Sequence, residues 1–121
     1  MRRFFFDTYA LVELAQGKPS YERFRDVPVV TELCNLYELI HAFAGAVPEG
    51  RIRTFIDDLN PNLLEPDLDD LFRASDFKRA HRRRRISYVD ALGYVLARKH
   101  GLTFLTGDKE FERMENIEFV R

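Results

Sequence analysis

Apolar residues in the first half of the chain form two short runs, and each run is followed by apolar positions at helical spacing. Residues 3–6 predict a buried strand, and residues 8–15 predict a helix directly behind it. Residues 27–31 predict a second strand. Behind this strand the apolar positions keep a helical period from residue 33 to residue 47, where Pro48 ends the helix. The pattern therefore predicts an order of strand, helix, strand and helix.

The second half of the chain continues this alternation. Ser87 opens a helix with Leu92 and Leu96 on its apolar face, and Gly101 closes the helix in the manner of a left-handed C-cap. The other expected elements are helices over 51–59 and 66–81, strands over 62–64 and 102–105, a short helix around Phe111, and an edge strand over 117–120.

Short strands that alternate with longer helices predict an α/β fold. Such an order requires crossover connections, so we expect a mainly parallel sheet with helices on both faces. In open sheets of this kind, ligands bind beyond the carboxyl ends of the strands. Asp7 follows the first predicted strand and Asp108 follows a late one. These two acids are therefore the first candidates for a functional site.

Length and composition narrow the class of protein. With 121 residues, of which 45% are hydrophobic and 32% charged, we expect one soluble globular domain over residues 1–121. The apolar run at the N-terminus meets Asp7 after a few residues, which is too short for a membrane span or a signal peptide, so we expect a cytoplasmic protein. The single cysteine, Cys34, excludes an intrachain disulfide and a zinc cluster, and we expect it to serve in packing.

The formal net charge of −1 hides two segregated segments. Residues 57–76 are strongly acidic, whereas residues 78–85 contain no acid and carry Lys78, Arg79, Arg82, Arg83, Arg84 and Arg85. A run of charges is often only a solvated helix end. The alternative for Arg82, Arg83, Arg84 and Arg85 is binding of RNA phosphates or of an acidic protein tail.

Three acids have an ordinary structural explanation next to a catalytic one. Asp7 and Asp108 each precede a helix, so each is a natural helix cap. Asp90 follows Ser87 at the spacing of a capping box. None of the three acids is diagnostic alone.

Glu38 is more informative, because it is the only charged side chain between Leu33 and Pro48. Helical spacing places it away from the apolar stripe of Leu33, Tyr37 and Ile40. A solvated surface position is one interpretation. The other is a covered carboxylate, which needs a counter-charge.

The four acids together predict a metal site. Carboxylates that are brought together raise one another's pKa values, so clusters occur mainly where a divalent cation compensates their charge. Oxygen ligands suit Mg²⁺ or Mn²⁺, and water bound to such an ion can supply a nucleophile. No basic residue is reliably expected beside any of the four acids in the fold.

Four motifs carry a resemblance to a known family: Phe6-Asp7-Thr8 after the first strand, Glu38 in the second helix, Asp90-Ala91-Leu92, and Thr106-Gly107-Asp108-Lys109-Glu110-Phe111. In order and spacing they resemble a PIN domain, most closely the VapC-type toxins. The resemblance covers nearly the whole chain.

The resemblance implies a Rossmann-like α/β/α sandwich of about five strands and a metal-dependent endoribonuclease that cuts single-stranded RNA. It makes Asp7, Glu38, Asp90 and Asp108 both catalytic residues and ligands of one or two Mg²⁺ or Mn²⁺ ions, with Thr106 and Thr8 as supporting residues. It also implies a homodimer and an antitoxin protein as partner.

Two features do not match the family pattern directly. Many relatives carry a further acid beyond the last Asp, and here Glu110 and Glu112 compete for that position. Tyr94 stands where relatives have a smaller residue, which leaves the packing of its helix open.

Other classes are weaker. Tyr9 occupies the place of the second acid that a haloacid-dehalogenase-like phosphatase needs, the acids of a phospho-receiver domain are missing, and no phosphate-binding glycine motif occurs. Two alternatives stay open: a non-catalytic RNA- or protein-binding module, and a PIN nuclease of housekeeping RNA processing.

Overall fold

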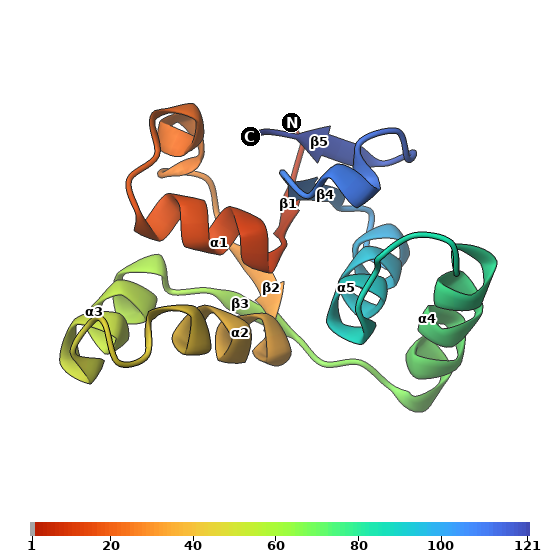
Figure 1. Cartoon of the computed structure of the whole chain (residues 1–121), viewed down its shortest axis with the longest axis horizontal. Coiled ribbons are helices and arrows are strands. Elements are labelled where there is room, and N and C mark those ends of the chain that lie inside the picture. The colour runs from red at the N-terminus through yellow and green to blue at the C-terminus, as the bar shows by residue number, and fades with distance from the viewer. Residues whose placement is uncertain (1) are drawn as a thin grey trace.

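The computed structural model describes residues 2–121, which form a five-stranded sheet between two layers of helices (Figure 1). The strands are β1 (Phe4–Phe6), β2 (Val30–Glu32), β3 (Asn62–Leu64), β4 (Thr103–Thr106) and β5 (Ile117–Phe119). The α-helices are α1 (Thr8–Ala15), α2 (Leu33–Phe43), α3 (Glu49–Leu59), α4 (Leu68–Ala80) and α5 (Tyr88–Lys99). Two 3₁₀ helices, η1 (Pro19–Phe24) and η2 (Lys109–Phe111), complete the fold.

All neighbouring strands are parallel, in the order β3-β2-β1-β4-β5. The chain builds outward from β1 through β2 to β3, and then returns to place β4 on the other side of β1. The strand order therefore reverses between β1 and β4, which is where ligands bind in sheets of this type. The expected parallel α/β architecture is confirmed, and its ligand-binding edge lies at the carboxyl ends of β1 and β4.

The two central strands send alternate side chains to opposite layers. Phe5 of β1 and Phe104 of β4 stack at 5.8 Å between ring centroids and join the core under α4 and α5. Phe6 and Leu105 join the core under α1 and α2. Because successive residues of a strand point to opposite faces, an unbroken apolar run is what a strand covered on both faces requires.

The packing of α5 shows how the fold accommodates Tyr94, which stands where relatives have a smaller residue. Its ring is buried and stacks on Phe77 of α4 at 4.6 Å, and its hydroxyl donates to the carbonyl of Glu115 at 2.6 Å. Gly93, the preceding residue, lies against Phe5, and a Cβ there would come within 2.9 Å of the ring. The bulky residue is thus accommodated beside a position that must stay small.

The apolar stripe predicted for α2 is wrong. Leu33, Tyr37 and Ile40 are exposed, whereas the buried side of the helix carries Asn35, Leu36 and Leu39. Apolar residues surround most of this helix, so spacing alone did not identify the face that packs on the sheet. Cys34 is also exposed, so the packing role expected for it is wrong as well.

Several element ends differ from their predicted positions for local reasons. α2 ends at Phe43 instead of Val47, because Ala44 leaves the helical conformation and Gly45 takes a φ of +82°. α4 begins at Leu68 instead of Pro66, because Asp67 forms a capping box with Asp70. Gly101 has a φ of +69°, as expected for a left-handed cap. Within residues 2–121, no helix is long and apolar enough to cross a membrane.

Candidate active site

Asp7 is the most deeply buried of the four candidate acids. It follows β1 at the ligand-binding edge and is 2% exposed. Its Oδ2 atom accepts a hydrogen bond of 2.7 Å from Thr106 Oγ1, and its Oδ1 atom is buried without a hydrogen-bond partner among the described residues. Asp7 occupies the N-cap position of α1 but makes no side-chain cap hydrogen bond. Helix capping therefore does not explain this carboxylate.

Burial, followed by the charge of Asp90, raises the pKa of Asp7 from 3.8 to about 8. The hydrogen bond from Thr106 opposes this shift, and the charge of Asp108 adds to it. A carboxylate at this position is costly in the protein alone, and a cation beside it would remove the cost.

Glu38 is held at the same edge through a chain of side-chain hydrogen bonds. Thr8 Oγ1 donates to Glu38 Oε1 at 2.6 Å, and Asn35 Nδ2 donates to Thr8 Oγ1 at 3.0 Å. Since Thr8 is the first residue of α1 and Glu38 lies in α2, this chain fixes one helix against the other at the site. Glu38 is partly buried, so the interpretation as a freely solvated surface residue is wrong.

Asp90 and Asp108 both serve as caps while facing the other acids. Asp90 forms a capping box with Ser87, in which Oδ2 accepts from the Ser87 backbone N–H at 3.1 Å. Burial raises the pKa of Asp90, and the charges of Asp108 and Glu38 raise it further. Asp108 Oδ1 caps η2 by accepting from the Glu110 backbone N–H at 3.0 Å. A capping role and a place in the acidic cluster are thus compatible.

Thr106 connects two of the acids directly. Its hydroxyl donates to Asp7, and its Oγ1 accepts a hydrogen bond of 3.1 Å from the backbone N–H of Asp108. The neighbouring Gly107 must stay small, because a Cβ there would lie 2.2 Å from Tyr9 Cε1 and 2.3 Å from the carbonyl oxygen of Val120. The segment 106–108 is therefore fixed tightly between α1 and the C-terminal strand.

Each of the four acids uses one carboxylate oxygen in a hydrogen bond and leaves the other without one among the described residues. No Lys, Arg or His of residues 2–121 forms an ion pair with any of them. Over the same residues, no three acids, histidines or cysteines are close enough to form a ready-made metal site. The acids are close enough for their charges to raise one another's pKa values, and each has a free oxygen. Binding of one cation by three of them would require these side chains to move closer together. Oxygen donors and an orphaned buried oxygen suit a hard divalent ion.

Two polar residues near this edge were not predicted. Glu32 ends β2, is 5% exposed, and accepts from the Cys34 backbone N–H at 3.0 Å. Asn35 is fully buried, and its Oδ1 has no partner in the described chain. The available signal for Glu32 was its place directly after a predicted strand, the same signal that identified Asp7.

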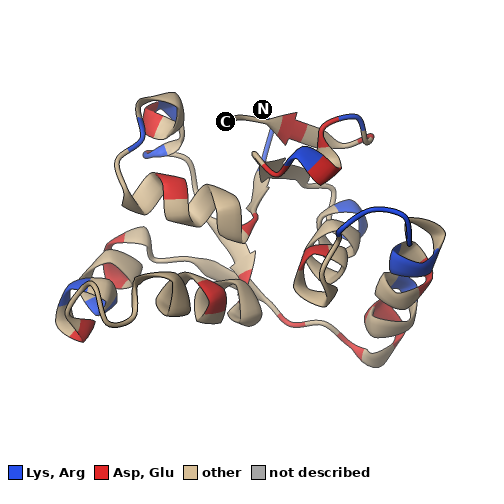
Figure 2. Cartoon of the chain, in the orientation of Figure 1, with Lys and Arg blue, Asp and Glu red and all other residues tan. Residues whose placement is uncertain are grey.

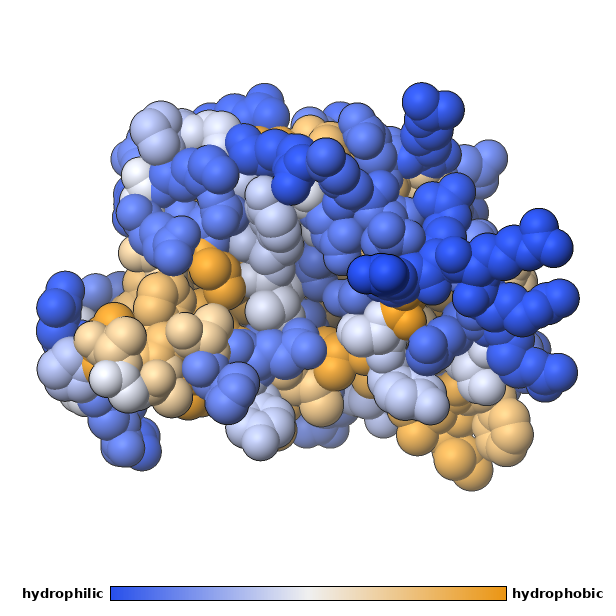
Figure 3. All heavy atoms as spheres, in the orientation of Figure 1, coloured by the Kyte–Doolittle hydropathy of each residue, from blue (hydrophilic) through white to orange (hydrophobic). Residues whose placement is uncertain are grey.

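Glu110 holds the arginine run against η2. Its backbone carbonyl accepts from Arg84 Nη1 at 2.7 Å, and its Oε1 accepts from the Arg85 backbone N–H at 2.9 Å. Glu112 is exposed, and its side chain makes no hydrogen bond or ion pair with the described residues. Figure 2 shows the basic loop as a blue arc that joins α4 to α5, and Figure 3 shows strongly hydrophilic side chains projecting from this part of the surface. The loop is thereby fastened to the short helix that follows Asp108.

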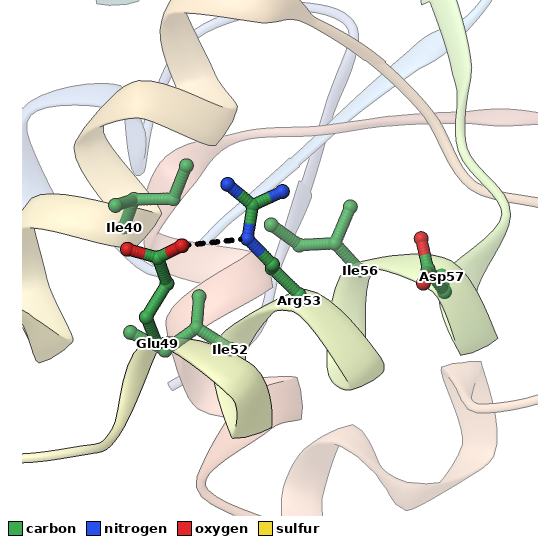
Figure 4. A pocket seen from close by; sticks show the side chains of 6 residues that line it. All are labelled: Ile40, Glu49, Ile52, Arg53, Ile56 and Asp57. Carbon is green, nitrogen blue, oxygen red and sulfur yellow. Dashed lines mark hydrogen bonds and ion pairs between the residues drawn. The ribbon is translucent and has the colours of Figure 1, made fainter.

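The cavity between α2 and α3 lies elsewhere. It measures about 300 Å³ and is lined by Ile40, Glu49, Ile52, Arg53, Ile56 and Asp57 (Figure 4). Two of its charged residues pair with each other, with Arg53 Nε 2.8 Å from Glu49 Oε2. None of the four candidate acids lines it, so we do not assign it to the site.

Solved structures of known proteins share this fold. VapC20 from Mycobacterium tuberculosis, described as a toxin that cleaves the sarcin–ricin loop, superposes with a TM-score of 0.79 at 19% identity, over 98% of this chain and 99% of that chain. A toxin–antitoxin complex from Klebsiella pneumoniae gives a TM-score of 0.78 at 18% identity, over 95% of each chain. VapBC2 from Rickettsia felis, solved with a DNA fragment from its promoter, gives 0.76 at 16% identity, over 98% of each chain.

Sequence comparison supports the same family. No curated protein matches the chain significantly. A family model described as PIN domain, however, matches residues 4–117, which include all four candidate acids. The predicted resemblance is thereby confirmed at the level of the family, and the chain belongs to the PIN-domain family.

Proposed function

We propose that this protein is a metal-dependent endoribonuclease that cleaves single-stranded RNA and acts as the toxin of a VapBC-type pair. Membership of the PIN family and the similarity of the fold to VapC toxins support a nuclease. The observation that carries the proposal is the buried Asp7, which has an orphaned Oδ1 and the charges of Asp90 and Asp108 nearby. Such an arrangement is stable as three carboxylates only with a compensating cation.

Asp7, Glu38, Asp90 and Asp108 would hold one or two Mg²⁺ or Mn²⁺ ions through their free oxygens. A bound ion would supply an activated water and would neutralise charge that develops on the phosphate. Thr106 and Thr8 keep the carboxylates of Asp7 and Glu38 in one orientation, because each donates its hydroxyl proton to one oxygen and leaves the other available. The chain itself thus presents oriented oxygens to a cation and to a phosphodiester.

The basic loop is proposed to guide the RNA backbone. Arg82, Arg83, Arg84 and Arg85 are exposed, and the contacts with Glu110 hold the loop beside the helix that Asp108 caps. Guanidinium groups bind phosphate oxygens through paired N–H donors, and they attract a polyanion over several ångströms. The loop therefore complements the repulsion that an acidic site exerts on RNA.

The direct test measures metal binding and cleavage in the same preparation. Isothermal titration with Mn²⁺ should show binding that Asp7→Asn and Asp90→Asn each weaken strongly, and cleavage of a single-stranded RNA should require Mg²⁺ or Mn²⁺. Asp57→Asn, at an exposed position of α3 away from the four acids, is the control and should change neither. RNA binding without any Mn²⁺ affinity would instead favour a non-catalytic binding module.

The toxin assignment and the partners form a separate part of the proposal. Two of the similar structures are toxin–antitoxin complexes, which supports an antitoxin partner for this chain. Growth arrest on expression, relieved by a protein encoded next to this gene, would support the toxin role. Growth without arrest, together with cleavage of a defined precursor RNA, would favour housekeeping processing. The proposed homodimer is tested by sedimentation at several concentrations.

A further inference from the structure

A second pocket, lined mainly by basic and aromatic residues, lies between the C-terminal part of α4, α5 and the segment that follows η2. It has a volume of about 490 Å³, within the range of about 300–1,000 Å³ typical of ligand sites. Its basic residues are Arg84, Arg98, Arg113 and His81, and the one acid is Glu115. Three guanidinium groups face one carboxylate, so the pocket attracts anions.

The cations of this pocket are weakly neutralised by the protein. Arg98 lies 3.7 Å from Glu115, whose side chain is 88% exposed, and such a surface pair contributes little. Arg113 is exposed and has no ion-pair partner among residues 2–121. Arg84 is held by a carbonyl oxygen, which leaves its charge uncompensated. A ligand with negative charge can therefore take these donors without breaking a strong interaction.

Aromatic and apolar side chains form the floor between the cations. Phe77 stacks on Tyr94 at 4.6 Å and packs on His81 at 4.3 Å, and Met114 completes the lining. His81 Nδ1 lies 2.9 Å from the carbonyl of Phe77, which fixes the ring across the end of α4. An apolar floor lowers the local dielectric, so guanidinium contacts with an anion are stronger here than on an open surface.

The pocket is connected to the acidic edge by a continuous set of contacts. Asp108 Oδ1 accepts from the Glu110 backbone N–H, and the Glu110 carbonyl accepts from Arg84. On α5, Asp90, Tyr94 and Arg98 lie on successive turns, and Arg98 Nη1 reaches the Tyr94 hydroxyl at 3.3 Å. Arg98 is therefore roughly 12 Å along the helix axis from Asp90, a span that a short stretch of single-stranded RNA covers.

We propose that this pocket is a phosphate subsite, in which Arg98 and Arg113 bind the RNA backbone a short distance from the bond that is cut. The proposal rests on the ribonuclease function proposed above. It differs from the guiding role of the basic loop, because Arg98 and Arg113 lie outside the loop and Arg84 is the one loop arginine that lines the pocket. An acidic protein segment is the competing ligand, and the continuity with the carboxylates favours RNA.

The experiment separates binding from cleavage. In the Asp7→Asn background, the affinity of the full chain for a single-stranded oligoribonucleotide is measured by fluorescence anisotropy at several salt concentrations. Adding Arg98→Gln and Arg113→Gln should weaken binding roughly tenfold at low salt. It should also make the plot of log affinity against log salt shallower by roughly 0.7 for each phosphate that the protein no longer binds.

The matched control is Arg51→Gln with Arg53→Gln, two exposed arginines of α3, which should leave the slope unchanged. Arg113→Gln alone should give part of the effect. Because Arg113 has no ion pair among the described residues, this single variant should fold normally, and it tests the subsite even if the double variant misfolds. An unchanged slope in the double variant overturns the subsite. If that variant loses binding of an oligoglutamate probe instead, the pocket takes an acidic protein segment and the RNA proposal is wrong.

The failure of the subsite and the failure of the proposed function give different results. A wild-type chain that cuts RNA with Mn²⁺, combined with an unchanged slope for Arg98→Gln/Arg113→Gln, removes only the subsite. A chain that neither binds Mn²⁺ nor cuts RNA removes the ribonuclease function, whatever the slope shows.

Discussion

Thr106 Oγ1 donates a hydrogen bond of 2.7 Å to Asp7 Oδ2, joining the ends of β4 and β1 across 99 positions of sequence. The bond stabilises the ionised form of Asp7 but occupies only one of its oxygens. The other oxygen is buried and has no partner in the described chain. The pair thus fixes a carboxylate in place while leaving its charge largely uncompensated, and this makes Asp7 the residue whose substitution is most informative.

Asp7→Asn should abolish RNA cleavage while raising the stability of the metal-free protein. The amide keeps nearly the same shape and cannot ionise, so it avoids the cost of burying an acid that is ionised in the unfolded chain, and activity and melting temperature should change in opposite directions. Cleavage assays with Mn²⁺ and thermal denaturation in EDTA check this. Near wild-type cleavage by the variant would remove Asp7 from the active site.

The stability of the metal-free protein should depend on pH through Asp7. Its pKa is about 8 in the folded chain and 3.8 as the ordinary value, so between about pH 4 and 8 the folded state holds one more proton than the unfolded state. The contribution of Asp7 is present below pH 4 and is lost as pH rises through 8, with a limiting slope of about 1.4 kcal/mol per pH unit.

Chemical denaturation across this pH range, for wild type minus Asp7→Asn, isolates this contribution from other groups. Subtracting the variant curve is necessary because other acids also titrate in this range. The pKa of Asp70, for example, is lowered, so its contribution to stability changes with pH in the opposite direction. Saturating Mn²⁺ should flatten the difference curve. A difference that is flat without metal would contradict the burial of an uncompensated Asp7.

Thr8→Val should weaken Mn²⁺ binding and lower stability. The change removes the donor to Glu38 Oε1 and leaves the buried Asn35 amide without its acceptor, a loss of about 1–3 kcal/mol in the free energy of unfolding. Thr8→Ser should restore both properties because it keeps the hydroxyl. Thr54→Val on exposed α3 is the control for the residue change itself, and an equal loss there would deny Thr8 a special role.

Conversion of Arg82, Arg83, Arg84 and Arg85 to Gln should reduce the salt dependence of RNA binding without changing Mn²⁺ affinity. Counterions released by phosphate contacts produce the salt slope, and the loop supplies no metal ligand. Binding isotherms at several salt concentrations measure the first effect and calorimetry measures the second. An unaltered slope, together with loss of a protein partner, would assign the loop to antitoxin binding.

Gly107→Ala should destabilise the protein by about 3 kcal/mol or more, because the added methyl group would overlap Tyr9 and the backbone oxygen of Val120. Gly50→Ala is a matched control in α3, where nothing lies within 4 Å, and it should raise stability by about 0.5–1 kcal/mol. Denaturant titration compares the two variants. Equal stabilities would show that segment 106–108 is looser than its contacts indicate.

The sequence predicted the sheet well because its strands lie in largely apolar segments, several of which are bounded by Gly or Pro. Residues 62–64 were placed correctly even though two of the three are exposed, since Pro61 and Pro66 bound them on either side. The buried face of α2 was not predictable by the same means. Its exposed Leu33 and Ile40 are as apolar as its buried Leu36 and Leu39, and only packing against the sheet distinguishes them.

The same limit applies to the site. Asp7 was predicted because it interrupts an apolar run at a strand end, and Glu38 because it is alone in an apolar helix. Asn35 was missed, because an uncharged amide within a helix gives no signal in the spacing of residues. Its role depends on a hydrogen bond to Thr8, which lies in another helix. The contact of Glu110 with the basic loop was missed for a similar reason, since it joins residues 25 and 26 positions apart.

The position of β1 at the centre of the sheet has a consequence for synthesis of the protein. Asp7 is translated 99 residues before its hydrogen-bond partner Thr106, and the neighbouring strand β4 is made equally late. A nascent chain that ends before Thr103 has an unpaired edge on β1 and lacks the Asp108 carboxylate. The acidic site therefore forms only after β4 and Asp108 have been translated, and premature termination before them yields a product in which the site is incomplete.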